Sequence, residues 1–358
     1  MIRLGHVSLN EKAKDLVNLV LEKGSIGQSE MVSQFEEAFA KWLGVKHCIA
    51  TASGTIADTV ALAVLKYFNP TKDEVIVPAL TFVAQINAVH YNHLKPVFCD
   101  VLSAPYFYLD PAYSTNKINK KTLCIFPAHL LGVPAPIEAT GNYLGVPIVG
   151  DACEALGSTH LLHDAHYKVG SFGAMTTFSF FPSHTITTGE GGMIATNDSD
   201  YAEVARRLIT HGKISNNDFH FDVIGFNGKM SSLQAAVGLG MMDELDSIVS
   251  QRRMNLMKLG GKLSTFYGSI CPHAMPYMAK SREHREAILE ILRVRGIECR
   301  NLFSCIPTQE PAYAHLGHRP GDFPIAEDIG NRGFYVPCHQ GLSEEDIQLI
   351  KKTIEAVL

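Results

Sequence analysis

Short apolar runs alternate with helix-like stretches through most of this 358-residue chain, and this alternation limits the folds open to it more than any other feature. Consecutive parallel strands need a crossover connection of a dozen or more residues, which is usually a helix. The alternation therefore predicts an α/β fold whose sheet is mainly parallel and flanked by helices. The strand-like runs are residues 74–77, 96–99, 123–126, 147–149, 175–180 and 193–195.

The chain is long enough for one large domain with a smaller companion. Hydrophobic residues make up 46% of it and charged residues 19%, which is ordinary for a globular protein with a sizeable core. Residues 231–245 have the pattern of a helix, after which the basic stretch 251–253 leads into the remainder. We therefore expect a large domain over residues 1–245 and a smaller α/β domain over residues 246–358.

Charge, hydropathy and cysteine spacing exclude several classes of partner. The net charge of −5 gives no reason to expect binding to nucleic acid or to an anionic membrane. No apolar run reaches the roughly 18 residues of a membrane span, and the first residues do not open a secretory signal, so we expect a cytoplasmic protein. The eight cysteines form no C-x-C or C-x-x-C pair, and we expect no metal site.

The segment at residues 178–192, FSFFPSHTITTGEGG, places a titratable side chain, His184, in a loop suited to holding a small ligand. It consists of an apolar strand, a turn at Pro182-Ser183-His184, and a loop rich in threonine and glycine. An imidazole has an unperturbed pKa of about 6.5, so it can accept a proton and return it in one catalytic cycle. The alternative is that a lone histidine in a turn is solvated or bonded to backbone.

Ser53, Gly54 and Thr55 stand where a loop opens the helix-patterned run 56–67. Amides at a helix N-terminus, together with hydroxyl groups and a small glycine, favour the binding of a phosphate. The alternative is an ordinary N-cap. Asp151, at the end of the apolar run 146–149, is either a buried carboxylate or the cap of a following helix.

Taken in order, these segments resemble those of the DegT/DnrJ/EryC1/StrS family, sugar aminotransferases of fold type I that use pyridoxal phosphate. The resemblance spans almost the whole chain, from the turn at residues 25–27 to residues 337–342. In most of the family, the position of His184 holds the lysine that binds the cofactor covalently. A minority branch, which resembles GDP-4-keto-6-deoxymannose 3-dehydratase, carries a histidine there after a serine or alanine, as in Ser183-His184. An imidazole cannot form a stable imine, so the cofactor would be held by non-covalent contacts.

The resemblance implies that pyridoxal 5'-phosphate or pyridoxamine 5'-phosphate is the cofactor and that five residues bind its two ends. Ser53, Gly54, Thr55 and Ser179 match residues that bind the phosphate. Asp151 matches the aspartate that keeps the pyridine nitrogen protonated, so that the ring can accept electrons.

Two further residues match positions around the cofactor ring. Phe82, in a P-x-x-T-F pattern, matches the aromatic side chain that covers one ring face, whereas by itself it reads as a core phenylalanine. Glu154 stands where the aminotransferases have glutamine or histidine and the dehydratase branch has an acid. On a helix it would share the face of Asp151 and contact the cofactor hydroxyl or orient His184; the alternative is a surface glutamate.

Four residues match positions that the family uses near the substrate or across a dimer interface. Asn227 lies in a segment that resembles G-Y-N-x-R-M-S and matches an asparagine that reaches the cofactor phosphate of the other subunit. This match implies a homodimer. The alternative is that Asn227 is a turn residue with positive φ. Lys229 replaces the more usual arginine of that segment and is a less rigid anion clamp. His211 and Arg300 match an H-G pair and a G-I-E-x-R segment and are candidate substrate contacts, although Arg300 reads equally as an exposed ion pair.

The expected function is therefore C3 dehydration of a nucleotide-linked 4-keto-6-deoxyhexose with glutamate as the amino donor. His184 would remove a proton from the benzylic carbon of the cofactor and assist loss of the 3-hydroxyl group. Loss of ammonia would then leave a 3-deoxy sugar.

Two other functions stay open from the sequence. One is an ordinary sugar aminotransferase, in which His184 is an engineered replacement or in which Lys168, Lys213 or Lys229 replaces the missing lysine. The other is a binding protein without turnover, against which the retained site residues argue. The region from about residue 260 to 285 is shorter than the resemblance leads us to expect for a dehydratase.

Overall fold

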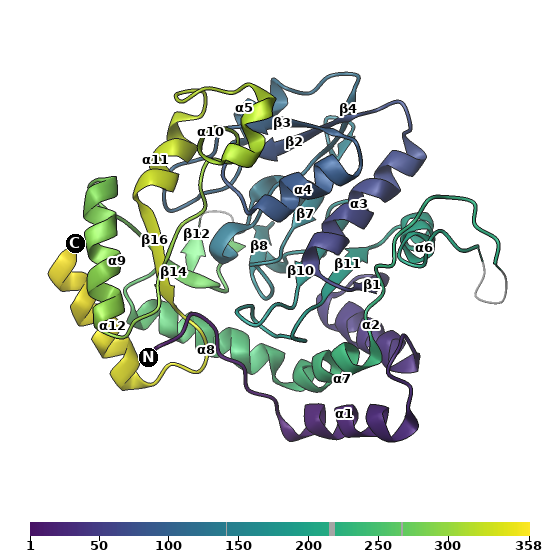
Figure 1. Ribbon diagram of the computed structural model, residues 1–358, viewed down its shortest axis with the longest axis horizontal. Coiled ribbons are helices and arrows are strands. Elements are labelled where there is room, and N and C mark those ends of the chain that lie inside the picture. The colour runs from purple at the N-terminus through teal and green to yellow at the C-terminus, as the bar shows by residue number, and fades with distance from the viewer. Residues whose placement is uncertain (141, 215–218, 266–267) are drawn as a thin grey trace.

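A mainly parallel sheet organises the larger part of the molecule (Figure 1). The computed structural model describes residues 1–140, 142–214, 219–265 and 268–358. Two groups of strands build the sheet, and parallel bridges from Ile125 to Ile148 and from Ala128 to Asp151 join them. In spatial order the strands are β1 (His47–Thr51), β11 (Gly192–Thr196), β10 (Met175–Ser179) and β7 (Val149–Asp151), and then β4 (Thr122–Ile125), β2 (Glu74–Pro78) and β3 (Lys95–Cys99).

The directions of the strands confirm the predicted α/β fold. β10 is parallel to β7, β2 is parallel to both β3 and β4, and β11 is antiparallel to its neighbours β1 and β10. Five of the six predicted runs match a strand to within about two residues. The run 147–149 is divided between β6 (Val146–Pro147) and β7, and β1 was not predicted.

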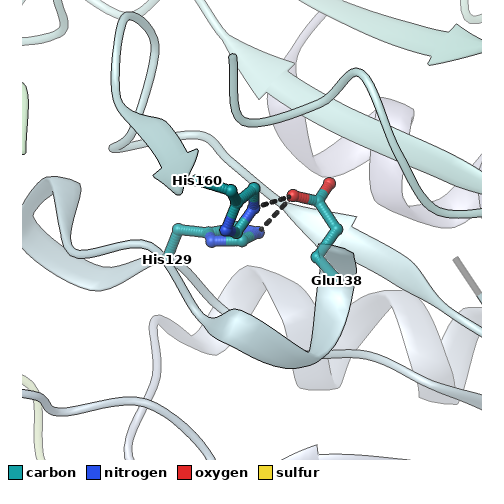
Figure 2. A group of neighbouring side chains, drawn as sticks. All are labelled: His129, Glu138 and His160. Carbon is teal, nitrogen blue, oxygen red and sulfur yellow. Dashed lines mark hydrogen bonds and ion pairs between the residues drawn. The ribbon is translucent and has the colours of Figure 1, made fainter. Parts of the chain in front are cut away.

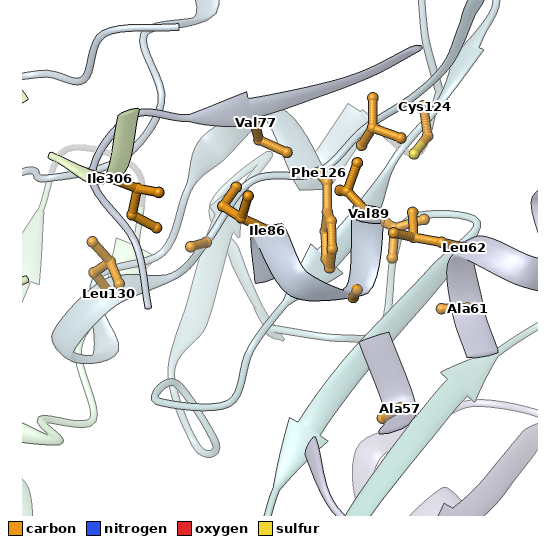
Figure 3. Packing of buried hydrophobic residues seen from close by; sticks show 14 of the residues in the cluster. Ala57, Ala61, Leu62, Val77, Ile86, Val89, Cys124, Phe126, Leu130 and Ile306 are labelled. Carbon is orange, nitrogen blue, oxygen red and sulfur yellow. The ribbon is translucent and has the colours of Figure 1, made fainter. Parts of the chain in front are cut away.

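Helices α3 (Gly54–Phe68), α4 (Val83–Tyr91) and α6 (Ser199–Leu208) belong to one core cluster with the strands (Figure 3). Figure 3 shows Ala57 and Ala61 of α3, whose small side chains allow the helix to lie close to the sheet. Ile86 and Val89 of α4 are completely buried in the same cluster. This packing holds the start of α3 against the ends of the strands.

A second core cluster joins helices α1 (Glu11–Lys23), α2 (Glu30–Leu43) and α7 (Ser232–Met241) to Phe178 of β10 and to Phe180, which follows that strand. Gly240 brings α7 very close to α1, because a Cβ atom there would lie 2.4 Å from the Cα atom of Ala13. The predicted helix at residues 231–245 is not one helix: α7 ends at Met241, and η3 (Met242–Glu244) connects it to α8 (Leu245–Lys258).

The chain after α8 forms a smaller α/β unit with its own buried cluster. Ile2, at the start of the chain, packs in this cluster and forms a parallel bridge with Ile297, and Figure 1 shows the N-terminus near this unit. This part of the chain contains β14 (Ala274–Met278), α9 (Arg282–Val294), β15 (Arg300–Asn301), β16 (Gly333–Pro337) and α12 (Glu344–Val357). It also contains α10 (Ile306–Gln309), η4 (Pro311–Leu316) and α11 (Pro324–Arg332), whose buried residues pack in the first core cluster with the large sheet.

Short elements complete the described part of the chain: α5 (Pro111–Thr115), η1 (Leu130–Gly132), η2 (Pro136–Thr140), β5 (Asn142–Tyr143), β8 (Thr159–Leu162), β9 (Ala165–Lys168), β12 (Ser264–Thr265) and β13 (Gly268–Ser269). Within the described residues, every helix is too short or too polar to cross a membrane.

Candidate active site

A cavity of about 290 Å³ opens where β7 and β10 end and α3 begins. In open α/β sheets, ligands bind at the carboxyl ends of the parallel strands, and this cavity has that position. It brings together most of the residues expected from the sequence, which come from five separate segments of chain. Those that line it are Ser53, Gly54, Thr55, Phe82, Asp151, Glu154, Ser179, His184 and Arg300.

The first turn of α3 and the end of β10 form one end of the cavity. Ser53 is the N-cap of α3, and its hydroxyl accepts a hydrogen bond from the amide of Ile56 at 3.2 Å. The first amides of a helix have no partner within the helix, so the cap and an anion site coexist here. A Cβ atom on Gly54 would lie 2.7 Å from that of Ser179, so only glycine leaves this end open.

Asp151 is the last residue of β7, and it has a second carboxyl group beside it. Its Oδ1 atom accepts a hydrogen bond from the amide of Cys153 at 3.1 Å. Asp58, buried on α3, places an oxygen within 4.8 Å of Asp151 and accepts a hydrogen bond from Thr177 at 2.6 Å. Burial raises the pKa of both carboxyl groups, and the charge of Asp151 raises that of Asp58 further. A cation placed beside Asp151 would relieve this repulsion.

The chain after Asp151 is a turn, so the predicted helix at this point is wrong. Asp151 is therefore not a helix cap, and Glu154 does not share a helix face with it. Glu154 still reaches the cavity, because the turn directs it inward. Its Oε2 atom accepts a hydrogen bond from the amide of Leu131 at 2.7 Å, and burial raises its pKa to about 7. The alternative of a surface glutamate is also wrong.

His184 lies in the turn after β10, where its backbone is fixed from two sides. Its amide donates to the carbonyl of Phe181 at 2.9 Å, and its carbonyl accepts from Nη2 of the buried Arg252 at 2.8 Å. Its ring Nδ1 has no hydrogen-bond partner among the described residues. Burial and the charge of Arg252 lower the pKa of His184 to about 3, so the ring is neutral near pH 7.

His273 also lines the cavity, and the sequence did not indicate it. It immediately precedes β14, and its ring centroid lies 5.1 Å from that of His184. Its Nε2 atom is 3.6 Å from Oε1 of Glu154, so it stands between the two residues expected to be functional. The chain has 16 histidines, and nothing in the local sequence of His273 distinguishes it from the others.

Phe82 is 56% exposed and forms part of the cavity wall, so its reading as a core residue is wrong. It precedes α4, and its ring centroid lies 5.8 Å from that of Phe303 in the smaller unit. Phe303 is a second lining residue that the sequence did not indicate.

A buried network lies behind the cavity, around the carboxylate of Glu138. Figure 2 shows His129 and His160 directed at this carboxylate, with Nε2 atoms 3.5 and 2.8 Å from Oε2. Thr176 of β10 donates to Oε1 at 2.5 Å, and the amide of His129 donates to the carbonyl of Asp151 at 2.9 Å. The network therefore connects the ends of β7 and β10 from behind.

The same network has residue types that bind metal ions, but the protonation state of His129 is unfavourable for a metal site. The amide of Ala135 donates to Nδ1 of His129 at 2.9 Å, and burial lowers the pKa of this histidine to about 4. The neutral ring must therefore carry its proton on Nε2, the nitrogen that faces Glu138. A metal ion would need the lone pair of that nitrogen, so we interpret the group as a hydrogen-bonded network.

Three expected site residues lie outside the cavity of their own chain. Asn227 is exposed and accepts a hydrogen bond from Nζ of Lys229 at 2.6 Å. It does not have positive φ, so the alternative that it is a turn residue with positive φ is wrong. His211 is exposed and its backbone has φ of 66°. Contact between these residues and a cofactor needs a second subunit, and it stays a prediction.

No lysine lines the cavity among the residues that the structure describes. Lys168 places its Nζ atom 4.1 Å from the ring centroid of Trp42, and Lys213 lies over Phe219 at 4.6 Å. Lys229 is occupied with Asn227.

These residues fit pyridoxal phosphate: a cradle that only glycine leaves open, a buried carboxylate for the ring nitrogen, and an exposed aromatic wall. The fold and the site are those of a fold-type I pyridoxal phosphate-dependent transferase, with a large domain and a smaller C-terminal unit. The model of the DegT/DnrJ/EryC1/StrS aminotransferase family matches residues 7–355, and the chain belongs to that family.

Named relatives include both aminotransferases and a dehydratase. The chain is 35% identical to GDP-perosamine synthase of Caulobacter vibrioides over 350 residues, which cover 93% of this chain and 91% of that one. A putative sugar aminotransferase of Streptococcus pneumoniae in its PLP form has a TM-score of 0.89 at 23% identity, covering 100% of this chain and 99% of that one. A GDP-4-keto-6-deoxymannose-3-dehydratase mutant with bound GDP-perosamine has a TM-score of 0.88 at 23% identity, covering 99% and 100%. The family and the fold bear out the pyridoxal phosphate cofactor expected from the sequence.

Proposed function

We propose that this protein is a pyridoxal phosphate- and pyridoxamine phosphate-dependent 3-dehydratase of a nucleotide-linked 4-keto-6-deoxyhexose, with glutamate as the amino donor. The observation that carries the proposal is the neutral imidazole of His184 in a cavity whose described wall contains no lysine. An aminotransferase of this family needs a lysine there to release its product. A histidine leaves proton transfer as the available chemistry.

The cofactor, when bound, supplies the amine that joins the 4-keto carbon of the sugar and the electron sink that allows a C–O bond to break. The chain holds it without a covalent bond. Ser53, Thr55 and Ser179 would donate to its phosphate, and Asp151 would hold a positive charge at its ring nitrogen. Phe82, which lines the cavity, would cover one face of the ring.

His184 is the base in this proposal. The ring is neutral near pH 7, which is the form that accepts a proton. Its low pKa makes it a weak base in the cofactor-free protein, but anionic groups in the cavity raise the pKa of an imidazole. The same ring can then return the proton to the 3-hydroxyl group as that group leaves.

The surroundings of His184 support this role. Arg252 bonds to its backbone carbonyl, which fixes the backbone from which the ring enters the wall. Glu154, whose pKa is about 7, can exchange protons with the site in the neutral range. It lies 3.6 Å from His273, whose pKa burial lowers well below its usual value.

The second candidate is a sugar aminotransferase, and the 35% identity to GDP-perosamine synthase favours it. That name, and the GDP-perosamine bound to the dehydratase mutant, also support a nucleotide-linked sugar as substrate. Against an aminotransferase stands the position of Lys168 and Lys213, whose ammonium groups lie over aromatic rings elsewhere.

We also propose that the protein works in the cytoplasm as a homodimer with shared active sites. The exposed Asn227 and the half-buried Lys229, which lie outside their own cavity, are available to a second subunit. The eight cysteines are all free, as is usual in a reducing compartment.

The test is to incubate the protein with pyridoxal phosphate, glutamate and a panel of CDP-, GDP- and dTDP-4-keto-6-deoxyhexoses. Ammonia, 2-oxoglutarate and sugar mass are followed together. Ammonia with a 3-deoxy sugar supports the dehydratase, whereas an amino sugar without ammonia establishes the aminotransferase. His184→Asn should abolish dehydration while the cofactor still binds, and the exposed His166→Asn should change neither; dehydration by His184→Asn would contradict the role of this residue.

A further inference from the structure

A second cavity, of about 600 Å³, lies in the smaller unit against the start of α4. Its wall comes from the first turn of α9, from residues 301–304 after β15, from α10 and from the end of α11. It shares Thr81, Phe82 and Phe303 with the cofactor cavity. A ligand can therefore extend from one cavity to the other past the pair of phenylalanine rings.

Two arginines give the second cavity its charge. Arg285 has a side chain only 4% exposed, with Nη1 bonded to the carbonyl of Gly330 at 2.7 Å and Nη2 paired with Glu286 at 2.5 Å. Arg282, one helical turn earlier on α9, is exposed and lines the same cavity. The carboxylate in the wall, Glu310, already accepts the hydroxyl of Ser304.

Three buried polar atoms in the wall have no hydrogen-bond partner among the described residues. They are Nε of Arg285 and Oγ1 of Thr308 in the smaller unit, and Oγ1 of Thr81 in the larger unit. Buried polar atoms are almost always satisfied in native proteins, so an unpaired guanidinium nitrogen in a cavity wall points to a missing acceptor. An acceptor that meets a guanidinium and a hydroxyl together is an oxyanion.

We propose that the second cavity binds the diphosphate group of the nucleotide-linked sugar, with Arg282 and Arg285 as its anion contacts. This inference rests on the proposed function, since it takes a nucleotide sugar as the substrate. The diphosphate is bonded directly to the anomeric carbon of the sugar, so a sugar held at His184 must place its phosphates in an adjacent space. The second cavity adjoins the cofactor cavity, is the larger of the two, and carries arginine, which suits phosphate oxygens.

The proposal is tested by calorimetric titration of the purified protein with GDP, CDP, dTDP, UDP and inorganic pyrophosphate. We expect at least one nucleoside diphosphate to bind, and Arg282→Gln and Arg285→Gln each to weaken its binding roughly tenfold or more. The matched control is Arg293→Gln, because Arg293 is an exposed arginine on the same helix that does not line the cavity. This control should bind with unchanged affinity.

Several outcomes separate the possibilities. Arg285 is buried, so its variant is also checked by thermal unfolding, whereas Arg282 is exposed and its replacement leaves the fold intact. Equal affinities in the wild type and in Arg282→Gln and Arg285→Gln overturn the proposal, as does the absence of binding of any diphosphate to the wild type. Competition by millimolar glutamate that depends on the same arginines also overturns it, because the site would then hold the amino donor.

The failure of the proposed function would look different. Arginine-dependent binding of a diphosphate by a protein that releases no ammonia from any sugar supports the diphosphate site and counts against the dehydratase. Dehydration that proceeds equally well in Arg282→Gln and Arg285→Gln, with unchanged KM, leaves the dehydratase standing and removes the diphosphate site.

Discussion

The imidazole ring of His273 lies 5.1 Å from that of His184, measured between the ring centroids. The two residues are far apart in the chain, and Arg252 bonds to the backbone carbonyls of both. His273 also approaches Glu154, at 3.6 Å between Nε2 and Oε1. The two rings and the carboxyl group thus form a short series of titratable groups along one wall of the cavity.

Replacing His273 by phenylalanine tests whether this series serves catalysis. The variant keeps a ring of similar shape but removes the nitrogens that face Glu154. We expect kcat to fall roughly 100-fold, which is at the lower end of the usual contribution of a general acid or base. Cofactor affinity, measured by absorbance titration, should change little. The control is His166→Phe, since His166 is exposed on β9; equal kcat in both variants would remove His273 from the mechanism.

The raised pKa of Glu154 predicts how stability varies with pH. Its pKa is about 7 in the folded protein and 4.5 in the unfolded chain, so the folded state binds more protons between these values. The stability of the cofactor-free protein should therefore fall as pH rises from 4.5 to 7. One pKa unit corresponds to about 1.4 kcal/mol, so the contribution of this residue is at most about 3 kcal/mol.

Urea unfolding of the wild type and of Glu154→Gln at pH 5 and pH 8 measures this contribution. The glutamine variant should lose less stability between the two values than the wild type, because it cannot ionise. An identical loss in both proteins would show that Glu154 has an ordinary pKa.

Gly150 precedes Asp151, and the Glu138 network leaves no room for a side chain there. A Cβ atom on Gly150 would lie 2.6 Å from Oε1 of Glu138 and 3.1 Å from Nε2 of His129. We expect Gly150→Ala to cost roughly 1–3 kcal/mol of stability, as overpacking usually does, and to weaken cofactor binding by displacing Asp151. Denaturant unfolding and cofactor titration check the two effects. Gly27→Ala is the control, since nothing lies within 4 Å of a Cβ atom at Gly27.

The neighbouring carboxyl groups of Asp58 and Asp151 predict a second loss of stability as pH rises. Burial and the charge of Asp151 raise the pKa of Asp58 well above its usual value, so Asp58 destabilises the folded protein progressively as pH rises. Asp58→Asn removes this ionisation and keeps an oxygen that accepts the hydrogen bond of Thr177. Relative to the wild type, the variant should be more stable at pH 8 than at pH 5 in thermal unfolding. Equal stability differences at the two pH values would mean that Asp58 is already ionised in the folded protein at pH 5.

Much of the site could be predicted from the sequence because its parts are local. Ser53 caps α3, Asp151 ends β7 and His184 occupies a turn, and each of these positions follows from residues next to it in the chain. The alternation of apolar runs likewise indicated the mainly parallel sheet. Where a local prediction failed, as with the helix after Asp151, the turn allowed Glu154 to enter the cavity.

The tertiary structure alone decided which distant residues complete the site. His273, Phe303 and Asp58 reach the cavity because the smaller unit packs against the sheet and α3 crosses its strands. None of them follows a local pattern, since single side chains on core elements look alike in sequence. The sequence also could not place three expected site residues within this chain. Contact of a cofactor with Asn227, His211 and Lys229 depends on a second subunit. The chain by itself determined the local shapes and the chemistry of His184; packing between segments far apart decided what surrounds it.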